Sequence, residues 1–124
     1  MHTLHSSRVP QAEIPLLTPR VKGCCVPVAS PLRSSHANEL SAIFRALADP
    51  TRVQMVHMLK AASEPICVCD FTAAFDLGQP TVSHHLARLK EAGLVTSFKR
   101  GVWSFYALRD DIGEAGQRAL ALIP

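Results

Sequence analysis

The chain begins with a proline-rich stretch and continues with a long region in which apolar residues recur at helical spacings. Residues 1–35 contain five prolines with interspersed serine and glycine, so neither a continuous helix nor a regular strand is expected there. Apolar patches at 14–17 and 26–28 would still allow this segment to pack on a domain or on a second subunit. We therefore predict an irregular N-terminal arm over residues 1–35 and a folded domain over residues 36–124.

Two helices are predicted at the start of this domain. From residue 38, apolar side chains at spacings of three and four form one face, and a second such face follows Asp49. Asp49 suits an N-cap, and Pro50 suits the first helical turn, where its missing N–H costs nothing. The expected apolar positions are Leu40, Ile43, Phe44 and Leu47 in the first helix and Val53, Met55, Val56 and Leu59 in the second.

A short helix, a turn and a longer helix are expected next. The short helix covers residues 68–75, and Gly78 suits a tight turn between helices. The longer helix begins near Gln79, with Pro80 in its first turn, and Gly93 is placed to cap its C-terminus. Its apolar face comprises Val82, Leu86 and Leu89.

A hairpin and a last helix complete the predicted domain. Residues 94–98 and 102–108 are rich in β-branched and aromatic side chains, and Lys99-Arg100-Gly101 joins them, which places two cations at the tip. A final helix over residues 110–123 has Ile112, Ala115, Ala119 and Ile123 on one face, although Gly113 and Gly116 weaken it. The predicted fold class is mainly α with a β-hairpin, a winged helix-turn-helix.

Polar side chains on the longer helix are typical of a DNA-reading surface. The second helix of a helix-turn-helix enters the major groove, where short or planar polar groups reach base edges and phosphates, while a basic hairpin contacts flanking phosphates. The candidate DNA-binding residues are Gln79, Thr81, Ser83, His84, His85, Arg88, Lys99 and Arg100.

Composition narrows the class of protein. The 124 residues carry a net charge of +3, which mildly favours a polyanionic partner such as double-stranded DNA. No run approaches the roughly 20 apolar residues of a membrane span, and the N-terminus lacks the pattern of a secretory signal, so a cytoplasmic protein without membrane contact is expected. No glycine-rich loop or triad-like pattern accompanies the cysteines, so no enzyme is expected.

The four cysteines form an adjacent pair, Cys24-Cys25, and a spaced pair, Cys67-Val68-Cys69. In a reducing compartment such clusters more often bind metal or undergo redox chemistry than form structural disulfides. Thiolates without acidic companions select soft or borderline ions, among them arsenite, antimonite, cadmium, lead and zinc. Arsenite and antimonite take three thiolates, whereas zinc and cadmium commonly take four ligands.

Three segments, at residues 44–52, 66–71 and 79–86, together resemble the ArsR/SmtB family of metal-responsive repressors. The resemblance runs from about Asn38 nearly to the C-terminus. It implies a homodimer with terminal helices at its interface, which occupies an inverted-repeat operator and leaves when metal binds. It also implies that the helix beginning at Gln79 reads the major groove.

The pair Cys67 and Cys69 resembles the arsenic-responsive motif of this family, except that Thr72 replaces the familiar third cysteine. Some family members place an adjacent cysteine pair in the N-terminal arm and combine it with a cysteine of the partner subunit. The resemblance therefore implies a site built from Cys24 and Cys25 together with Cys67, Cys69 or both. Arsenite or antimonite would act as inducer, and no cofactor is expected to be permanently bound.

Two expectations concern the local geometry of the spaced cysteine pair. Side chains at i and i+2 of an ideal helix point about 200° apart, so one ion would bind both thiols only if the first turn unwound. A position near a helix N-terminus would also lower the pKa of these thiols.

Several alternatives stay open at this stage. The same fold would serve a repressor that responds to cadmium, lead or zinc, or one whose cysteines form a reversible disulfide. The cysteines would also suit a structural zinc module, or Cys67 and Cys69 would simply be small buried residues. A carboxylate and histidine site on the terminal helix is not supported, because no histidine follows His85.

Overall fold

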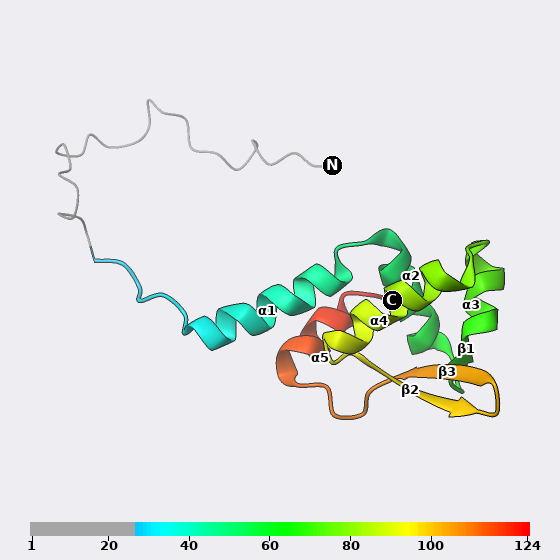
Figure 1. Cartoon of the computed structure of the whole chain (residues 1–124). Coiled ribbons are helices and arrows are strands. Elements are labelled where there is room, and N and C mark those ends of the chain that lie inside the picture. Colours follow the sequence, from blue (N-terminus) through cyan, green and yellow to red (C-terminus); the bar gives the residue numbers. More distant parts are fainter. Residues whose placement is uncertain (1–26) are drawn as a thin grey trace. The chain divides into compact units, whose positions relative to one another are not determined.

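The structure is a computed structural model that describes residues 27–124 of the chain. Its elements follow one another in the order helix, helix, strand, helix, helix, strand, strand, helix (Figure 1). They are α1 (Ser34–Leu47), α2 (Pro50–Ala61), β1 (Ile66–Cys67), α3 (Val68–Phe75), α4 (Gln79–Glu91), β2 (Val95–Arg100), β3 (Trp103–Leu108) and α5 (Glu114–Ala121). This arrangement confirms the predicted winged helix-turn-helix. Within the described residues, no helix has the length and apolar character needed to cross a bilayer.

The corner between α1 and α2 forms as its sequence predicts. Asp49 has extended backbone, and its carboxylate accepts a hydrogen bond of 3.1 Å from the amide of Arg52. Pro50 occupies the first turn of α2. The N-cap thus satisfies one of the amides that the start of a helix leaves without an intrahelical partner.

The first helix differs from its prediction in two respects. It begins at Ser34, four residues before Asn38, and it buries Ile43 and Ala46 while the side chain of Phe44 is 60% exposed. The spacing of three and four residues identified the apolar positions of this helix, but it did not identify which of them pack on the core. Phe44 lies on the flank that faces α5.

The turn between α3 and α4 relies on Asp76 rather than on Gly78. Asp76 ends α3 in the left-handed conformation with φ of 53°, which short polar side chains tolerate better than most residues. Gly78 has an ordinary φ of −69° and serves as the N-cap of α4. The predicted turn at residues 76–78 is confirmed, but its left-handed residue is Asp76 and not Gly78.

The end of α4 is closed by a Schellman motif. Gly93 has φ of 78°, its amide donates to the carbonyl of Lys90 at 2.9 Å, and the amide of Leu94 donates to the carbonyl of Leu89 at 3.1 Å. Leu89 and Leu94 are both buried, which supplies the apolar contact that accompanies this motif. The predicted cap at Gly93 is confirmed.

The sheet has three antiparallel strands in the order β1-β3-β2, one more than the predicted hairpin. Ile66 and Cys67 pair with Tyr106 and Phe105 of β3. Lys99 and Arg100, expected at the tip, belong to strand β2, and the turn is the dipeptide Gly101-Val102. The φ of Gly101 is 61°, as the first central residue of a type II′ hairpin turn requires.

The core lies where α2, α3, α4 and the inner side of the sheet meet. The predicted face of α4 is confirmed, since Val82, Leu86 and Leu89 are fully buried. Phe71 of α3 and Met55 of α2 are fully buried beside them. In α5 the buried positions are Gly116 and Leu120 rather than the predicted Ala115 and Ala119. An added Cβ at Gly116 would lie 2.5 Å from Ile112, so this glycine permits close packing of α5.

Replacing Gly93 by alanine tests the C-terminal cap of α4. No atom lies within 4 Å of the added Cβ, so the cost comes from the left-handed backbone alone. We expect Gly93→Ala to lower the free energy of unfolding by about 1–2 kcal/mol in urea titrations. Gly113→Ala is the matched control, because Gly113 has equal space but φ of −66°; since it is also the N-cap of α5, it should change stability by less than about 1 kcal/mol. Equal effects of the two substitutions would contradict this account.

Candidate functional site

The outward face of α4 carries most of the predicted DNA-binding residues. Its first exposed positions are Gln79 and Thr81, followed by His84 and Arg88, while Ser83 is half-buried. Arg88 pairs with Glu91 at 3.0 Å, but both side chains are more than half exposed, so this pair holds Arg88 only weakly. The buried Val82, Leu86 and Leu89 on the opposite face fix α4 in the domain, which leaves this polar face open to a ligand.

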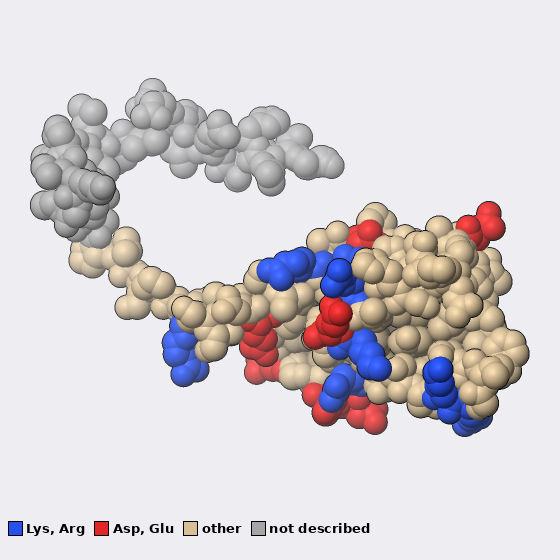
Figure 2. Space-filling model, viewed as in Figure 1, with Lys and Arg blue, Asp and Glu red and all other residues tan. Residues whose placement is uncertain are grey.

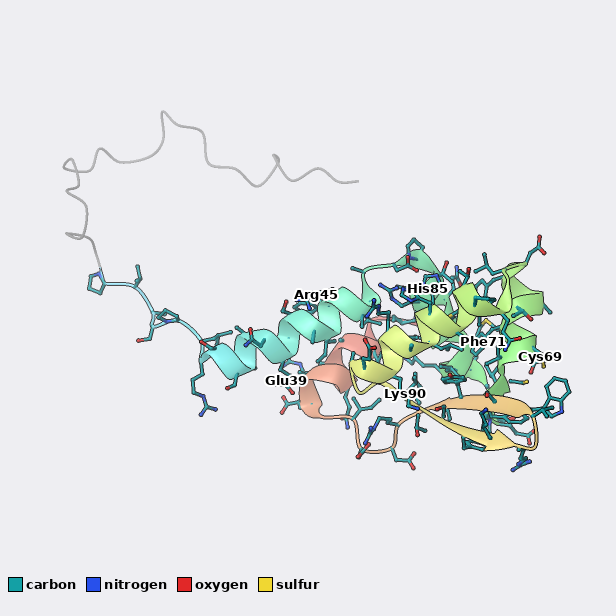
Figure 3. All side chains as sticks on the ribbon, viewed as in Figure 1. Glu39, Arg45, Cys69, Phe71, His85 and Lys90 are labelled. Carbon is teal, nitrogen blue, oxygen red and sulfur yellow. The ribbon has the colours of Figure 1, made fainter. Side chains whose placement is uncertain are left out.

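His85 is directed into the protein, unlike its neighbour His84. His85 lies on α4, and its side chain is 15% exposed (Figure 3). Its Nδ1 lies 3.2 Å from Nη1 of Arg52 and 3.8 Å from the carboxylate of Asp49. A guanidinium only donates hydrogen bonds, so Arg52 pairs with Nδ1 of His85 when that nitrogen carries no proton, whereas a protonated ring would pair with the carboxylate of Asp49. His85 thus joins α4 to the corner between α1 and α2.

Arg52 is the centre of that junction. Its Nε donates to the carbonyl of Ala46 at 2.6 Å, and its Nη2 donates to the carbonyl of Arg45 at 3.3 Å. Both carbonyls lie in the last turn of α1, and that of Arg45 also accepts from the amide of Ala48 at 3.4 Å. Arg52 belongs to α2, and its side chain thus bonds the end of α1 and a histidine of α4. Sequence reasoning missed Arg52, because no local signal marks a contact with a residue 33 positions away.

Asp49 completes the junction electrostatically. The amide of Arg52 is the main cause that lowers the pKa of the Asp49 carboxyl, and the charges of His85 and Arg52 act in the same direction. A lowered carboxyl pKa means that the carboxylate stabilises the fold fully above its ordinary titration range. That stabilisation is lost only as the pH falls through the lower pKa of the folded state.

The hairpin presents its cations beside an aromatic pair. The rings of Phe98 and Phe105 stack with centroids 5.7 Å apart, and the guanidinium of Arg100 lies 5.8 and 5.9 Å from the two centroids. Lys99 is exposed on the adjacent position of β2. Figure 2 shows Lys and Arg atoms gathered at the end of the hairpin. Such a wing offers positive charge that is partly preoriented by cation–π contact.

Cys67 and Cys69 lie side by side at the start of α3. Cys67 is the N-cap residue, with extended backbone in β1, and its Sγ accepts from the amide of Cys69 at 3.4 Å. The two Sγ atoms are 2.8 Å apart. The expectation that both thiols bind one ion only after the helix unwinds is therefore wrong, because Cys67 precedes the helix and its side chain is not subject to helical geometry.

The protonation of this pair also differs from expectation. The thiol of Cys69 donates a hydrogen bond to Sγ of Cys67, and this bond is the main cause that raises the pKa of Cys69. Desolvation and the nearby charges of Cys67 and Asp70 raise that pKa further, against a smaller opposing effect of the Asp70 amide. The prediction that the helix N-terminus lowers this pKa is wrong for Cys69.

The thiol pair lacks further ligands in the part of the chain that the structure describes. Over residues 27–124, no group of three Cys, His, Asp or Glu side chains is placed to hold a metal ion. Asp70 accepts from the amide of Cys67 at 3.3 Å, and Thr72, which replaces the third cysteine, donates to the carbonyl of Cys69. The predicted ligands Cys24 and Cys25 lie outside the described residues. Cys67 is buried and Cys69 is exposed, so only one thiol of the pair is open to solvent.

An apolar groove runs between α1 and α5. Its lining includes Leu40, Phe44, Ala115, Ala119 and Leu122, of which Phe44 is 60% and Leu122 is 86% exposed. Glu39, Glu114 and Arg118 also line it, so charged groups accompany the apolar ones. A groove of this composition is typical of a surface that another chain covers.

Comparison with known proteins identifies similar sequences. The profile of a family described as "Bacterial regulatory protein, arsR family" matches residues 49–97. The arsenic resistance transcriptional regulator ArsR1 of Pseudomonas putida is 40% identical over 70 residues, which are 56% of this chain and 54% of that regulator. The arsenical resistance operon repressor of Staphylococcus xylosus is 37% identical over 73 residues, 59% of this chain and 68% of that repressor.

Two further comparisons bear on the ligand and on assembly. A homologue of the cadmium resistance regulatory protein CadC from Staphylococcus aureus is 34% identical over 80 residues, 64% of this chain and 65% of that protein. The homodimeric winged helix-turn-helix domain of a possible ArsR-family regulator from Mycobacterium bovis is 26% identical with a TM-score of 0.61, covering 79% of this chain and 86% of that one. The chain spans little more than half the length of the Pseudomonas putida regulator.

Substituting the two adjacent histidines of α4 distinguishes a residue that holds α4 in place from one that could contact DNA. His85→Leu removes the acceptor of Arg52 from a half-buried junction, so we expect the free energy of unfolding to fall by about 1–3 kcal/mol. His84→Leu is the matched control: its side chain is exposed, so stability should change by less than about 0.5 kcal/mol. Urea unfolding followed by circular dichroism measures both. If His85→Leu kept full stability but lost affinity for DNA, His85 would instead contact the nucleic acid.

Proposed function

Because this chain belongs to the arsR family of bacterial regulatory proteins, we propose that it is a homodimeric repressor released from operator DNA by arsenite or antimonite. The observation that carries the inducer half of this proposal is the pair of adjacent thiols at the start of α3, 2.8 Å apart. A soft trivalent ion bound there would sit on the first helix of the helix-turn-helix.

The DNA half of the proposal rests on α4 and the hairpin. Exposed polar side chains on α4 suit base edges in the major groove, and the cations of β2 suit flanking phosphates. The proposed contacts are Gln79, Thr81, Ser83, His84, Arg88, Lys99 and Arg100. We assign His85, first expected among them, to the positioning of α4, because its ring is engaged by Arg52.

Inorganic arsenite requires a third thiolate beyond Cys67 and Cys69. We assign this role to Cys24 or Cys25, from the same chain or from the partner. Their position outside the described residues leaves the choice to experiment. Ligation would then tie the N-terminal arm to the start of α3, in one subunit or across the dimer.

A route from the thiols to the reading helix follows from the cap of α3. Sγ of Cys67 accepts from the amide of Cys69, and a metalloid bound to that sulfur would compete for the same lone pairs. The first turn of α3 would lose its cap, and α3 packs on α4 through the fully buried Phe71. Metal binding would in this way favour a conformer in which α4 is displaced, which is how a ligand shifts a two-state equilibrium.

The groove between α1 and α5 supports the proposed homodimer. It exposes Phe44 and Leu122, and burying such side chains against a second copy would remove apolar area from water. The similar domain from Mycobacterium bovis is a homodimer. Two α4 helices on one dimer would address two half-sites of an inverted repeat.

A second candidate retains the same fold and changes the inducer. The similar protein from Staphylococcus aureus is named for cadmium resistance, and four cysteines would supply a tetrahedral site for cadmium, lead or zinc. A reversible disulfide is a third possibility, because the Cys67 and Cys69 sulfurs already lie near each other.

Release of DNA by arsenite tests the proposal directly. Fluorescence anisotropy of operator DNA, under reducing conditions, is followed while arsenite, cadmium or zinc is added to the full chain. We expect micromolar arsenite to release the DNA from the unchanged protein. Cys69→Ser and the double change Cys24→Ser with Cys25→Ser should each weaken the response at least tenfold without changing DNA affinity in the absence of metal, since none of these side chains belongs to the proposed DNA surface.

Three outcomes would contradict the proposal. Release by cadmium but not by arsenite would favour the tetrahedral alternative, and release by peroxide alone, reversed by a thiol reductant, would favour the disulfide. If arsenite, cadmium and peroxide all left DNA binding unchanged, the protein would be a regulator that does not sense these agents through its thiols.

The salt dependence of DNA binding tests the wing. Each neutralised phosphate contributes about 0.9 to the slope of log K against log salt concentration, so Lys99→Ala should reduce that slope by about 1.8 for a dimer with two wings. Arg109→Ala is the matched control, because Arg109 is paired with Asp111 at 2.8 Å at the opposite end of β3. An equal loss of slope in both variants would argue against a phosphate contact by the wing.

A further inference from the structure

Within residues 34–124, large apolar side chains are exposed in two places. Phe44 and Leu122 belong to the groove between α1 and α5, which the proposed dimer would cover. The others lie on the hairpin, where the side chain of Val102 is 85% exposed and that of Trp103 is 55% exposed. Neither the proposed dimer nor the proposed polar contacts of α4 explain why two such side chains are open to solvent at the end of the wing.

The two cations of the hairpin project from opposite faces of it. Side chains alternate between the two faces along a strand. Ser97 accepts a hydrogen bond of 2.7 Å from Lys90 of α4, so the face that Ser97 shares with Lys99 is the one on the side of α4. Arg100 lies on the other face, where its guanidinium is placed over the stacked aromatic pair. One positive charge therefore flanks the hairpin on each side.

The turn of the hairpin projects beyond the charge of Arg100. The guanidinium of Arg100 lies 5.8 Å from the ring centroid of Phe98, so the charge is level with Phe98. Gly101 is three residues further along the chain, which corresponds to about 10 Å at about 3.4 Å per residue of antiparallel strand. Gly101, Val102 and Trp103 thus form an apolar tip in front of the cations.

Charge favours a polyanion as the occupant of this apolar tip. Residues 95–108 include Lys99 and Arg100 but neither Asp nor Glu. On the face of the described residues that Figure 2 shows, Lys and Arg atoms lie at the end of the hairpin without Asp or Glu atoms beside them. A protein that covered the tip would have to desolvate these charges or supply carboxylates. The minor groove of a DNA duplex instead has phosphates along both edges and sugars between them.

The dimensions of the minor groove agree with those of the hairpin. This groove is about 7.5 Å deep in B-form DNA, so a turn that reaches about 10 Å beyond the guanidinium of Arg100 is long enough to meet its floor. The groove is only about 6 Å wide, and two strands lie about 4.8 Å apart before their side chains are counted. Insertion therefore requires the groove to open, as it does around proteins that insert apolar side chains.

We propose that the apolar tip inserts into the minor groove of duplex DNA next to the site of α4, an inference that rests on the proposed DNA binding. Val102 lies against the floor of the groove and Trp103 against the sugars of one wall, while Lys99 and Arg100 face the phosphates of the two edges. A G·C pair carries an exocyclic amine on the floor of this groove, and an A·T pair does not. The tip therefore favours A·T pairs at the positions that it covers.

The fluorescence of Trp103, the single tryptophan of the chain, tests whether DNA covers the tip. The probe is a duplex selected from a random-sequence pool by its binding to the full chain under reducing conditions. We expect the bound duplex to reduce the quenching of Trp103 by acrylamide, because an indole that is 55% exposed in the free protein would be screened by the sugars.

Replacing Val102 by serine separates apolar contact from charge. We expect the affinity for the selected duplex to fall about tenfold for a dimer with two tips, because each tip loses part of the burial of a valine. The slope of log K against log salt concentration should not change, in contrast to Lys99→Ala, because no phosphate contact is lost. Val28→Ser is the matched control, since Val28 precedes α1 and is also 85% exposed, and it should leave the affinity unchanged. Circular dichroism confirms that each variant is folded.

Inosine identifies the groove that the tip contacts. Hydroxyl-radical footprinting locates the sugars that are protected by the unchanged protein and not by Val102→Ser. G·C pairs placed at those positions should weaken binding of the unchanged protein. I·C pairs should restore it, because inosine lacks the minor-groove amine of guanine and keeps its major-groove acceptors. For Val102→Ser, the difference between G·C and I·C duplexes should disappear.

Three results would overturn the inference while leaving DNA binding by α4 intact. They are a bound duplex that does not change the quenching of Trp103, an unchanged affinity of folded Val102→Ser, and equal binding of G·C and I·C duplexes by the unchanged protein. A shift of Val102→Ser to a smaller assembly in sedimentation, with its DNA affinity unchanged, would show that a second copy covers the tip. Failure of the full chain to select any duplex would contradict the repressor proposal as well.

Discussion

The position of α4 against the first two helices depends on the hydrogen bonds of one cation, Arg52. Its guanidinium donates to the carbonyls of Arg45 and Ala46 at the end of α1 and to the ring of His85 on α4. Hydrophobic packing by Val82, Leu86 and Leu89 holds α4 on the core, but apolar contact is not directional. The apolar face decides which side of α4 turns outward, and the directional bonds of Arg52 hold α4 against the corner between α1 and α2. Asp49 supports them by capping α2 beside the same cation.

Much of the fold was predictable because its determinants are local. Asp49, Pro50 and Gly93 mark helix ends through their own backbone chemistry, and the spacing of apolar residues identified the buried face of α4. Strand β1 was missed, because two residues offer no alternation to detect and their pairing with β3 spans about forty positions. The bond from Arg52 to His85 was missed for the same reason, since no pattern within one helix records its tertiary partner.

The distance between the two thiols depends on the residue at which α3 begins. If Cys67 lay inside α3, its sulfur would point away from that of Cys69. As the N-cap, it has extended backbone, and its sulfur meets that of Cys69. The sequence indicated the cysteines and their soft ligands, because residue type alone decides that preference. It did not indicate their mutual distance, their protonation or the pairing of Cys67 with Phe105, because these depend on a strand that pairs with a distant part of the chain.

The connection between α1 and α4 has a geometric consequence for the proposed dimer. The helix that lines the groove with α5 is the same helix whose end is fastened to α4 by Arg52. Its 14 residues span about 21 Å, at 1.5 Å per residue. In the proposed dimer, α1 would therefore connect the interface to α4, and a change in the length of α1 would alter the distance between the two α4 helices.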